Sequence, residues 1–356
     1  MDNVFYFKKI NSIGGVETFI YYLAKKYEFK FYYKEANPEQ IKRLSQYVEV
    51  HKYKEPIKCD KFFCNYGLDI EVESKEKYHI IHCDYKQVSF KPIRYEGFKY
   101  IGVSQLACDS FKELTGEDIE LIYNPVEIEK SKVEKYNDGK LHLISGTRLT
   151  KEKGFKRMQK LAKMLDKSGI NYEWLIYSNK HKEKIGKNVI YKEPKLNILE
   201  DIAKADYLVQ LSDCEAYCYT VIESLMVGTP VIVTDLPVFK ELGVKHKENA
   251  FICDFNMSNV DLDMITKKSL KFDYKSPISK WNKYLSTEKT YNPNELVEVR
   301  TLKRIYLVEE NKHYLRNKII KVTKARASYL EVKGLVEWNR ATPKNIPKVA
   351  PKKKGK

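Results

Sequence analysis

The chain has 356 residues, 43% of them hydrophobic, and a formal net charge of +17. It is long enough for two folded domains, and it has no recognisable signal peptide and no apolar run as long as a membrane span. The cysteines are scattered singly without a CxxC pair, which argues against a disulfide framework or zinc site and predicts reduced thiols in the cytoplasm. A large positive charge suits a nucleic-acid or anionic-membrane partner, but the dispersed lysines favour lysine-rich usage in general.

Strands and helices alternate through the first part of the chain. Strands are predicted over residues 3–8, 29–33, 48–53, 61–64, 78–82, 100–103 and 120–123. Helices are predicted from Val16, from Pro38 to about residue 47, and over 105–114, where Gly116 provides a stop. This alternation is typical of a doubly wound parallel sheet that binds ligands at the carboxyl ends of its strands. The charged residues 127–139 are predicted to be a linker.

The alternation restarts after the linker. Strands are predicted over residues 141–145, 174–177, 207–211, 231–234 and 250–253. Helices are predicted over residues 155–165, 198–205 and 238–242, with a further short helix after Glu215. The second part of the chain is therefore expected to form a second α/β sheet of the same type.

The most informative segment runs from Asp213 to Asp235 and reads DCEAYCYTVIESLMVGTPVIVTD. Glu215 and Glu223 stand eight positions apart at the entrance to its short helix. A helix N-terminus attracts phosphate, which repels carboxylates, so sugar and ribose hydroxyls are the better partners for the two glutamates. On spacing alone, an ordinary α/β crossover with solvated glutamates is an equally good interpretation.

Further segments point to one family. The segment with the two glutamates resembles the Glu-x7-Glu region of retaining glycosyltransferase family 4, whose architecture is GT-B. Similar matches occur in the family's order over about residues 3–255, namely INSIGGVETFIYYLAKKY, HIIHCDY, YIGVSQLACDSFKE, LIYNPVEI and LISGTRLTKEKGF. The resemblance implies two Rossmann-like domains facing across a cleft, with residues 1–130 on the acceptor side and 140–290 binding the nucleotide sugar. It also implies a helix over about 278–285, carrying Trp281, that crosses back between them.

The resemblance assigns the donor site residue by residue. Glu215 is expected to bind hydroxyls of the donor sugar and to be catalytic, and Glu223 to bind the ribose. Backbone amides near four residues are expected to line the sugar and diphosphate, namely Tyr217, Cys218, Tyr219 and Thr220. The family usually has Glu-Gly-Phe-Gly where this chain has Glu-Ala-Tyr-Cys, which leaves the sugar specificity open.

The same resemblance assigns the residues around the diphosphate and the base. Arg148 and Lys153 match the family's phosphate-binding pair, and Gly154 allows close backbone approach. Gly14 and Gly15 are expected to close over the diphosphate from the opposite domain. The loop 193–196 is expected to meet the base. His82 is expected to be catalytic through sugar contact or transition-state support, without being an obligatory general base.

The implied enzyme is a retaining hexosyltransferase that uses a nucleoside-diphosphate sugar, with UDP as the favoured nucleotide, and requires no metal. Asp261-Leu-Asp263 has the spacing of a metal motif, but it lies after the core in a predicted helix and is interpreted as surface. The acceptor is left open among a glycan, a protein and modified DNA. An inactive GT-B protein that only binds nucleotide sugars, and a GT-B sugar epimerase, are the alternatives.

The C-terminal part does not fit the family. Two strands are predicted over 299–309 and 313–323, followed by a helix that Thr323 caps and Gly334 ends. This β-β-α pattern, over 295–341, resembles a small module of phage-associated proteins, and an extended family tail helix with a crossover is the alternative. Residues 342–356 are rich in lysine and are predicted to be a disordered arm that contacts nucleic acid or another anionic polymer, or only aids solubility.

Overall fold

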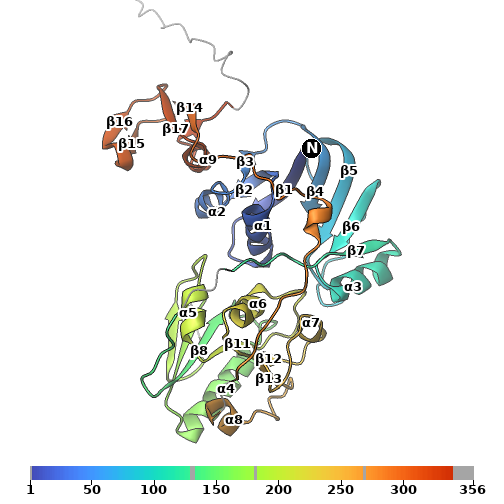
Figure 1. Ribbon diagram of the computed structural model, residues 1–356, viewed down its shortest axis with the longest axis vertical. Coiled ribbons are helices and arrows are strands. Elements are labelled where there is room, and N and C mark those ends of the chain that lie inside the picture. Colours follow the sequence, from blue (N-terminus) through green and yellow to red (C-terminus); the bar gives the residue numbers. More distant parts are fainter. Residues whose placement is uncertain (1, 129–132, 180–182, 268–269, 340–356) are drawn as a thin grey trace, which may run out of the picture.

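The computed structural model describes residues 2–128, 133–179, 183–267 and 270–339. These residues form two large parallel sheets, one above the other in Figure 1, and a small module near the end of the described chain. Helices alternate with strands through most of the second sheet and at both ends of the first, so the chain has the predicted α/β architecture with two doubly wound domains. The predicted arm over 342–356 lies outside the described residues.

The N-terminal domain is built on a seven-stranded sheet with the order β3-β2-β1-β4-β5-β6-β7, and every neighbouring pair is parallel. Its strands are β1 (Asn3–Ile10), β2 (Lys30–Ala36), β3 (Glu49–Lys52), β4 (Ile57–Asn65), β5 (Val72–Ile81), β6 (Phe98–Gly102) and β7 (Ile119–Leu121). Its helices are α1 (Gly15–Lys26), α2 (Pro38–Leu44) and α3 (Gln105–Thr115). The strand order reverses between β1 and β4, which is where a doubly wound sheet leaves a crevice for ligands.

The second domain is built on a six-stranded parallel sheet with the order β10-β9-β8-β11-β12-β13. Its strands are β8 (Leu141–Gly146), β9 (Tyr172–Tyr177), β10 (Val189–Lys192), β11 (Tyr207–Gln210), β12 (Val231–Thr234) and β13 (Ala250–Cys253). Its helices are α4 (Phe155–Ser168), α5 (Leu199–Lys204), α6 (Tyr219–Met226), α7 (Pro237–Glu241) and α8 (Leu262–Lys267). Edge strand β10 was not predicted, because its short sequence shows no clear alternation.

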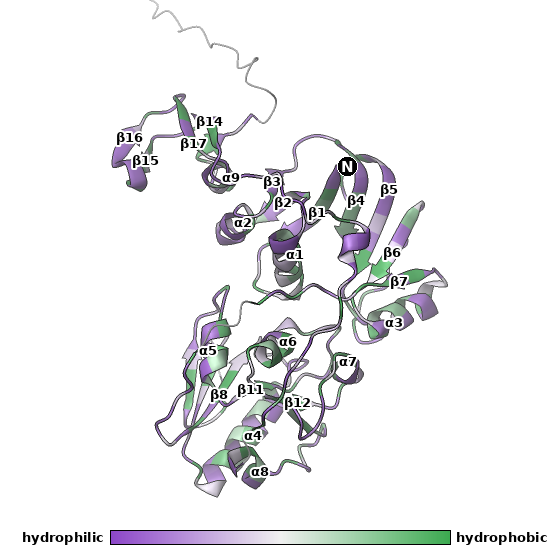
Figure 2. Ribbon diagram, in the orientation of Figure 1, coloured by the Kyte–Doolittle hydropathy of each residue, from purple (hydrophilic) through white to green (hydrophobic). Residues whose placement is uncertain are grey.

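Helix α4 illustrates why these segments fold as they do. Figure 2 shows it with hydrophilic and hydrophobic residues interleaved, and Met158, Leu161 and Leu165 are buried at helical spacing. Asp263, from the segment with metal-motif spacing, lies on α8 and is exposed, as predicted, where it pairs with Lys267. No helix in the described ranges is long and apolar enough to cross a membrane.

The chain crosses back to the N-terminal domain at Trp281, as predicted, but without the predicted helix over 278–285. Only residues Trp281–Lys283 form a helical turn, of the 3-10 type. Trp281 is fully buried against Phe5 and Phe63 of the N-terminal sheet, whereas Ile278 is 82% exposed. Within the predicted helix, apolar side chains are buried only from this turn onward, so the residues before it lack the tertiary packing that would stabilise a longer helix.

The C-terminal module is a three-stranded sheet covered by one helix, with a separate hairpin beside it. Strands β14 (Leu296–Thr301), β17 (Ile319–Thr323) and β18 (Val336–Glu337) form the sheet, and β15 (Ile305–Leu307) pairs with β16 (Lys312–Tyr314). Each of the two predicted strands is therefore broken into two, because the chain bends after Thr301 and again before Lys318, where Asn317 is left-handed.

The helix of the module agrees with the prediction. Helix α9 (Lys324–Val332) begins where the Thr323 hydroxyl accepts from Arg326 N at 3.2 Å, and Gly334 follows it with φ of +66°. The helix packs on α2 and β3, since Lys54 Nζ lies 2.9 Å from Glu331 Oε1 and Ser45 Oγ donates to the Ala325 carbonyl. The module is thus attached to the N-terminal domain.

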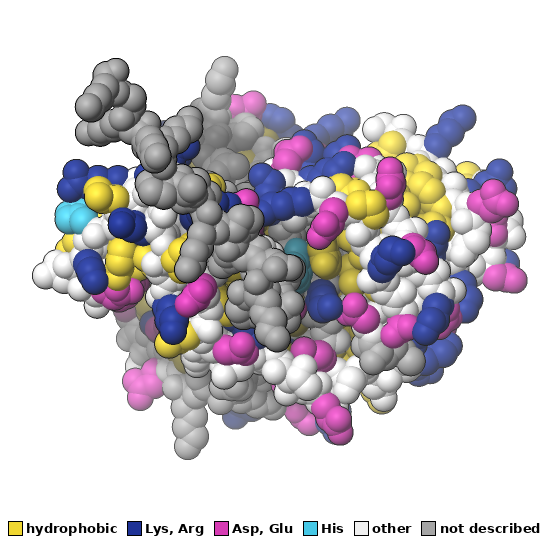
Figure 3. Space-filling view, turned by 90° about the horizontal axis from the view of Figure 1, so that it is seen from above, with side chains coloured by type: hydrophobic (Ala, Val, Ile, Leu, Met, Phe, Trp, Pro, Cys, Tyr) yellow, Lys and Arg dark blue, Asp and Glu magenta, His cyan; other side chains and the backbone are white. Residues whose placement is uncertain are grey.

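Charged side chains are dispersed over the surface, in agreement with the even distribution of lysines along the sequence. Figure 3 shows lysine and arginine side chains interspersed with aspartate and glutamate over the visible face, without one basic patch. Many of these lysines make exposed ion pairs, such as Lys58–Glu73 and Lys75–Asp60. Pairs of this kind contribute little to stability but balance local charge.

Candidate active site

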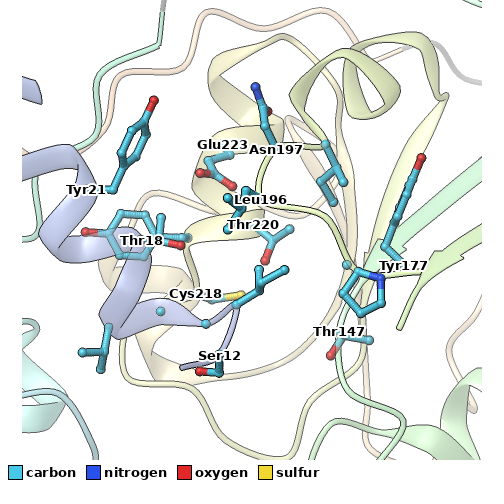
Figure 4. Close-up of a pocket in the computed structure, with 18 of the residues that line it drawn as sticks. Ser12, Thr18, Tyr21, Thr147, Tyr177, Leu196, Asn197, Cys218, Thr220 and Glu223 are labelled. Atoms are coloured by element: carbon cyan, nitrogen blue, oxygen red, sulfur yellow. The ribbon is translucent and has the colours of Figure 1, made fainter. Parts of the chain in front are cut away.

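A cleft of about 1470 Å³ lies between the two large domains. Every residue predicted for the donor site or for catalysis lines it, namely Gly14, Gly15, His82, Arg148, Lys153, Glu215, Tyr217, Cys218, Tyr219, Thr220 and Glu223. In Figure 4, Cys218, Thr220 and Glu223 lie between α1 on one side and Thr147 and Tyr177 on the other. The fold therefore brings residues more than 200 positions apart in sequence to one cavity.

Glu215 and Lys153 form a partly buried ion pair in the lining of the cleft. Lys153 Nζ lies 2.7 Å from Glu215 Oε1, and the two side chains are 20% and 11% exposed. Ser212 Oγ and Gln210 Nε2 also donate to Glu215 Oε1, at 2.7 and 3.1 Å. Burial lowers the pKa of Lys153, but the charge and hydrogen bond of Glu215 outweigh it and leave the pKa raised. Lys153 is therefore charged at neutral pH, and its ammonium is held against the Glu215 carboxylate.

Helix α6 begins at Cys218, whose backbone is left-handed with φ of +65°. A side chain other than glycine in this conformation costs about 1 kcal/mol. The resemblance described above leads one to expect glycine at this position, and Cys218 keeps a glycine-like backbone while carrying a thiol. Burial raises the pKa of Cys218, which keeps the thiol neutral beside the amides of α6. Those amides form the anion-binding end of the helix.

Glu223 lies one turn further along α6 and meets the opposite domain. The Tyr22 hydroxyl on α1 donates to Glu223 Oε1 at 2.8 Å, and the Tyr22 ring stacks on Tyr219 at 5.6 Å. Burial raises the pKa of Glu223, opposed by the Tyr22 hydrogen bond and the charge of Arg43. Sequence reasoning missed Tyr22 because no local pattern marks a partner 201 positions away.

Three glycines around the cleft differ in whether a larger residue would fit in their place. Gly154 has φ of +79°, and an added Cβ would lie 1.7 Å from the Leu211 carbonyl oxygen, so only glycine fits this turn before α4. Gly14 has an extended backbone that any residue adopts. A Cβ at Gly15 would meet nothing within 4 Å, so its lack of a side chain leaves space open at the cleft.

His82 stands at the carboxyl end of β5, in an aromatic environment. Its ring centroid lies 4.9 Å from that of Phe19 and 6.3 Å from that of Tyr66. Burial lowers the pKa of His82 to about 3, so the imidazole is neutral over the physiological range. Its Nε2 is buried and has no hydrogen-bond partner in the described structure, an unsatisfied polar atom that is unusual in a folded protein.

The phosphate and base side of the cleft is more open. The Arg148 side chain is 70% exposed and approaches Glu152 at 3.6 Å, so it lines the cleft without joining the Lys153–Glu215 pair. The predicted base loop lines the cleft through residues 194–196. Tyr177, at the end of β9, was missed, although the carboxyl end of a parallel strand is where such a residue is expected.

No group of three or more His, Cys, Asp or Glu side chains that could hold a metal ion occurs within the described ranges. Lys153, Arg148 and the backbone amides at the start of α6 line the cleft in the predicted diphosphate region, and Lys25, Arg43 and Lys195 line it as well. Lysine acts there as a point charge and arginine as a planar fork, and both can neutralise a leaving phosphate.

This architecture, with two Rossmann-like domains and a cleft between their strand ends, is the GT-B fold, and solved structures share it. HepE from Anabaena, solved with UDP and glucose, is 14% identical with a TM-score of 0.60, covering 75% of this chain and 89% of HepE. A glycosyltransferase from Rickettsia africae is 14% identical with a TM-score of 0.53, covering 72% and 84%. WaaG, a glycosyltransferase involved in lipopolysaccharide biosynthesis, is 12% identical with a TM-score of 0.52, covering 74% and 88%.

A comparison with protein-family models gives a sequence match in addition to the shared fold. Residues 126–267, which include the second domain, match the family described as glycosyl transferases group 1. No curated protein sequence matches the chain. Together, the group 1 domain and the GT-B fold support a GT-B glycosyltransferase.

Proposed function

We propose that the protein is a retaining, metal-independent glycosyltransferase of family 4 that moves a hexose from a nucleoside-diphosphate sugar, favoured to be UDP-linked, to an acceptor hydroxyl. The observation that carries this proposal is the joint position of Glu215 and Glu223 at the start of α6, beside Lys153 in the interdomain cleft. The free cysteine thiols support a reducing, cytoplasmic location. The phage association of the C-terminal module stays a prediction.

In the proposed reaction, the bond between the sugar C1 and the diphosphate oxygen breaks as the bond between C1 and the acceptor oxygen forms on the same face. The acceptor proton passes to the departing phosphate oxygen. Lys153, Arg148 and the amides of α6 stabilise the negative charge that develops on the diphosphate. Glu215 holds sugar hydroxyls, and Glu223 holds the ribose. The neutral His82 contacts the sugar.

The first experiment measures donor binding by thermal shift, and turnover by mass spectrometry, with UDP-, GDP- and ADP-sugars in the presence of EDTA. UDP-glucose is the first donor to try, because HepE was solved in complex with it. We expect one donor to stabilise the protein and to be slowly hydrolysed. Stabilisation by none of them would overturn the proposal.

The matching variant is Glu223→Gln, which keeps the shape of the side chain and removes its charge. We expect it to weaken donor binding about 10- to 100-fold, the effect of losing a hydrogen bond to a charged group. Glu200→Gln is the control, since Glu200 also lines the cleft but pairs with Lys204 on the surface. Intact donor binding and turnover in Glu223→Gln would refute the assignment.

An inactive nucleotide-sugar-binding protein is the second candidate. Ala216 and Cys218 favour it, because they stand where the family has glycines and add side chains beside the sugar and the diphosphate. A donor that binds but is neither hydrolysed nor transferred would support this reading. Release of free nucleotide with an altered sugar, in the absence of an acceptor, would instead indicate the epimerase.

A further inference from the structure

Three exposed apolar side chains stand at the N-terminal side of the cleft. Ile13, Tyr66 and Phe90 are 47%, 41% and 49% exposed. They lie on the loops that follow β1, β4 and β5, which are consecutive neighbours in the sheet order. Because the carboxyl ends of parallel strands share one edge of a sheet, the three loops meet at the edge that faces the cleft. We call the rings of Tyr66 and Phe90, together with the Ile13 side chain on the neighbouring loop, the aromatic rim.

The rim is held in place from below. The Phe90 ring lies 5.9 Å from the ring of Tyr85 and 6.4 Å from that of Tyr66, both in edge-to-face geometry. Tyr85 is itself buried. Aromatic pairs in this geometry stabilise each other beyond the burial of their surface. Phe90 is thus a supported ring, although half of its surface faces solvent.

Tyr66 is fixed in a conformation that tyrosine rarely adopts. Its φ is +49°, and its carbonyl accepts from the Tyr95 hydroxyl at 3.2 Å, while that hydroxyl accepts from Leu68 N at 2.7 Å. Left-handed backbone in a residue other than glycine persists where the surroundings impose it, and such residues gather at ligand sites. The loop 82–97 that carries Phe90 also lacks regular structure over an unusual length, as binding loops do.

The rim joins the proposed site of transfer. Ile13, Tyr66 and His82 line the same cleft, and the imidazole ring of His82 lies next to the ring of Tyr66. A molecule resting on the rim would therefore reach the sugar side of the cleft without crossing the nucleotide side, where Tyr177 and residues 194–196 lie.

The charges beside the rim are largely balanced. On the loop 82–97, Lys86 pairs with Glu113, and Arg94 approaches Glu117 at 3.8 Å. Lys91 is the only lysine or arginine of that loop for which the described structure has no ion pair. A polyanion would find little net charge here. A lipid chain would find the rings interrupted by the exposed polar Gln87 and Ser89.

We propose that the acceptor is an uncharged glycan that lies against the aromatic rim and directs a terminal hydroxyl toward His82. A pyranose ring presents one C–H face that packs on an aromatic ring, and a belt of hydroxyls that need polar neighbours. Exposed, supported rings among neutral polar groups match both requirements. This inference rests on the proposed transferase function for its role, although glycan binding to the rim can be measured without the donor.

The test is saturation-transfer NMR with neutral hexasaccharides of glucose, galactose and N-acetylglucosamine, alongside a heparin hexasaccharide and single-stranded dT20. We expect a neutral probe to bind, with an affinity that does not change between 50 and 300 mM NaCl. Phe90→Ala should weaken that binding about two- to tenfold, the effect of one lost aromatic contact, and Phe90→Trp should retain it. The control Tyr306→Ala removes an equally exposed ring from the C-terminal hairpin and should change nothing.

The donor assay separates the two proposals. Thermal stabilisation by UDP-glucose should be the same in Phe90→Ala as in the wild type, which also shows that the variant is folded. If glycan binding depends on Phe90 but no donor binds, the proposed transferase function is refuted and the glycan site at the rim is supported. Glycan binding unaffected by Phe90→Ala, no binding of a neutral probe, or salt-sensitive binding of dT20 or heparin alone would overturn the inference.

Discussion

Replacing Tyr22 by phenylalanine removes the hydroxyl through which α1 of the N-terminal domain contacts Glu223 of the second domain. The ring that stacks on Tyr219 is kept, and only the hydroxyl that donates to Glu223 is removed. Since the cleft also buries the carboxylate, the lost hydrogen bond to a charged group is worth about 2 kcal/mol. At roughly 2–4 °C per kcal/mol for a chain of this kind, we expect the Tm to fall by about 4–8 °C.

The same change alters how donor binding depends on pH. Burial raises the pKa of Glu223, and the Tyr22 hydroxyl holds it down, so Tyr22→Phe should raise that pKa further. In the proposed function the ionised carboxylate accepts hydrogen bonds from ribose, so we expect donor binding to strengthen as pH rises through the raised pKa. The folded protein itself responds in the opposite sense. The raised pKa means stability that is fully present below the unfolded value and is lost as pH rises through the folded value.

The assays are differential scanning fluorimetry for Tm and calorimetry with UDP-glucose from pH 5 to 8. UDP-glucose is preferable to UDP, because its phosphates do not titrate in this range. Tyr21→Phe is the control, since Tyr21 lines the same cleft and no hydrogen bond of its hydroxyl occurs in the described structure. A Tm within about 1 °C of the wild type, together with an unchanged acidic limb of UDP-glucose binding, would refute this reasoning.

Three further substitutions test other parts of the cleft. Gly154→Ala should lower the free energy of unfolding by more than about 3 kcal/mol, because the new Cβ would lie 1.7 Å from a backbone carbonyl oxygen. Gly228 is also left-handed but has open space around it, so Gly228→Ala should lower that free energy by only about 1 kcal/mol. Thermal melts of the two variants compare these effects. Lys153→Met removes a phosphate-facing charge and leaves Glu215 without its ionic partner, so calorimetry should show at least about tenfold weaker UDP-glucose binding, partly restored by Lys153→Arg. Cys218→Gly relieves the left-handed strain and should raise the Tm by about 2–4 °C while UDP-glucose still binds; a lower Tm would contradict the strain argument.

Local patterns in the sequence were enough for most of the fold. Strands β12 and β13 were predicted with their observed bounds, because each is a short continuous apolar run between turns. The helix at Trp281 failed, since apolar spacing cannot distinguish one buried turn from several. The bends that divide the strands of the C-terminal module also escaped prediction, because one of them depends on the left-handed Asn317.

The candidate site was only partly within reach of sequence. The position of Glu215 beside Lys153 follows from strand ends that meet at one edge of a parallel sheet. The contact of Tyr22 with Glu223 and the aromatic rim depend on how two domains meet and how three loops converge. Neither leaves a periodic signal, because the partners lie in different elements and share no spacing.

The attachment of the C-terminal module has a mechanical consequence. Because α9 is anchored to α2 and β3 through Ser45 and Lys54, the module and the sheet that carries the aromatic rim form one body. The distance between the module and the rim is therefore fixed, so a molecule bound to the module would lie at a constant distance from the rim.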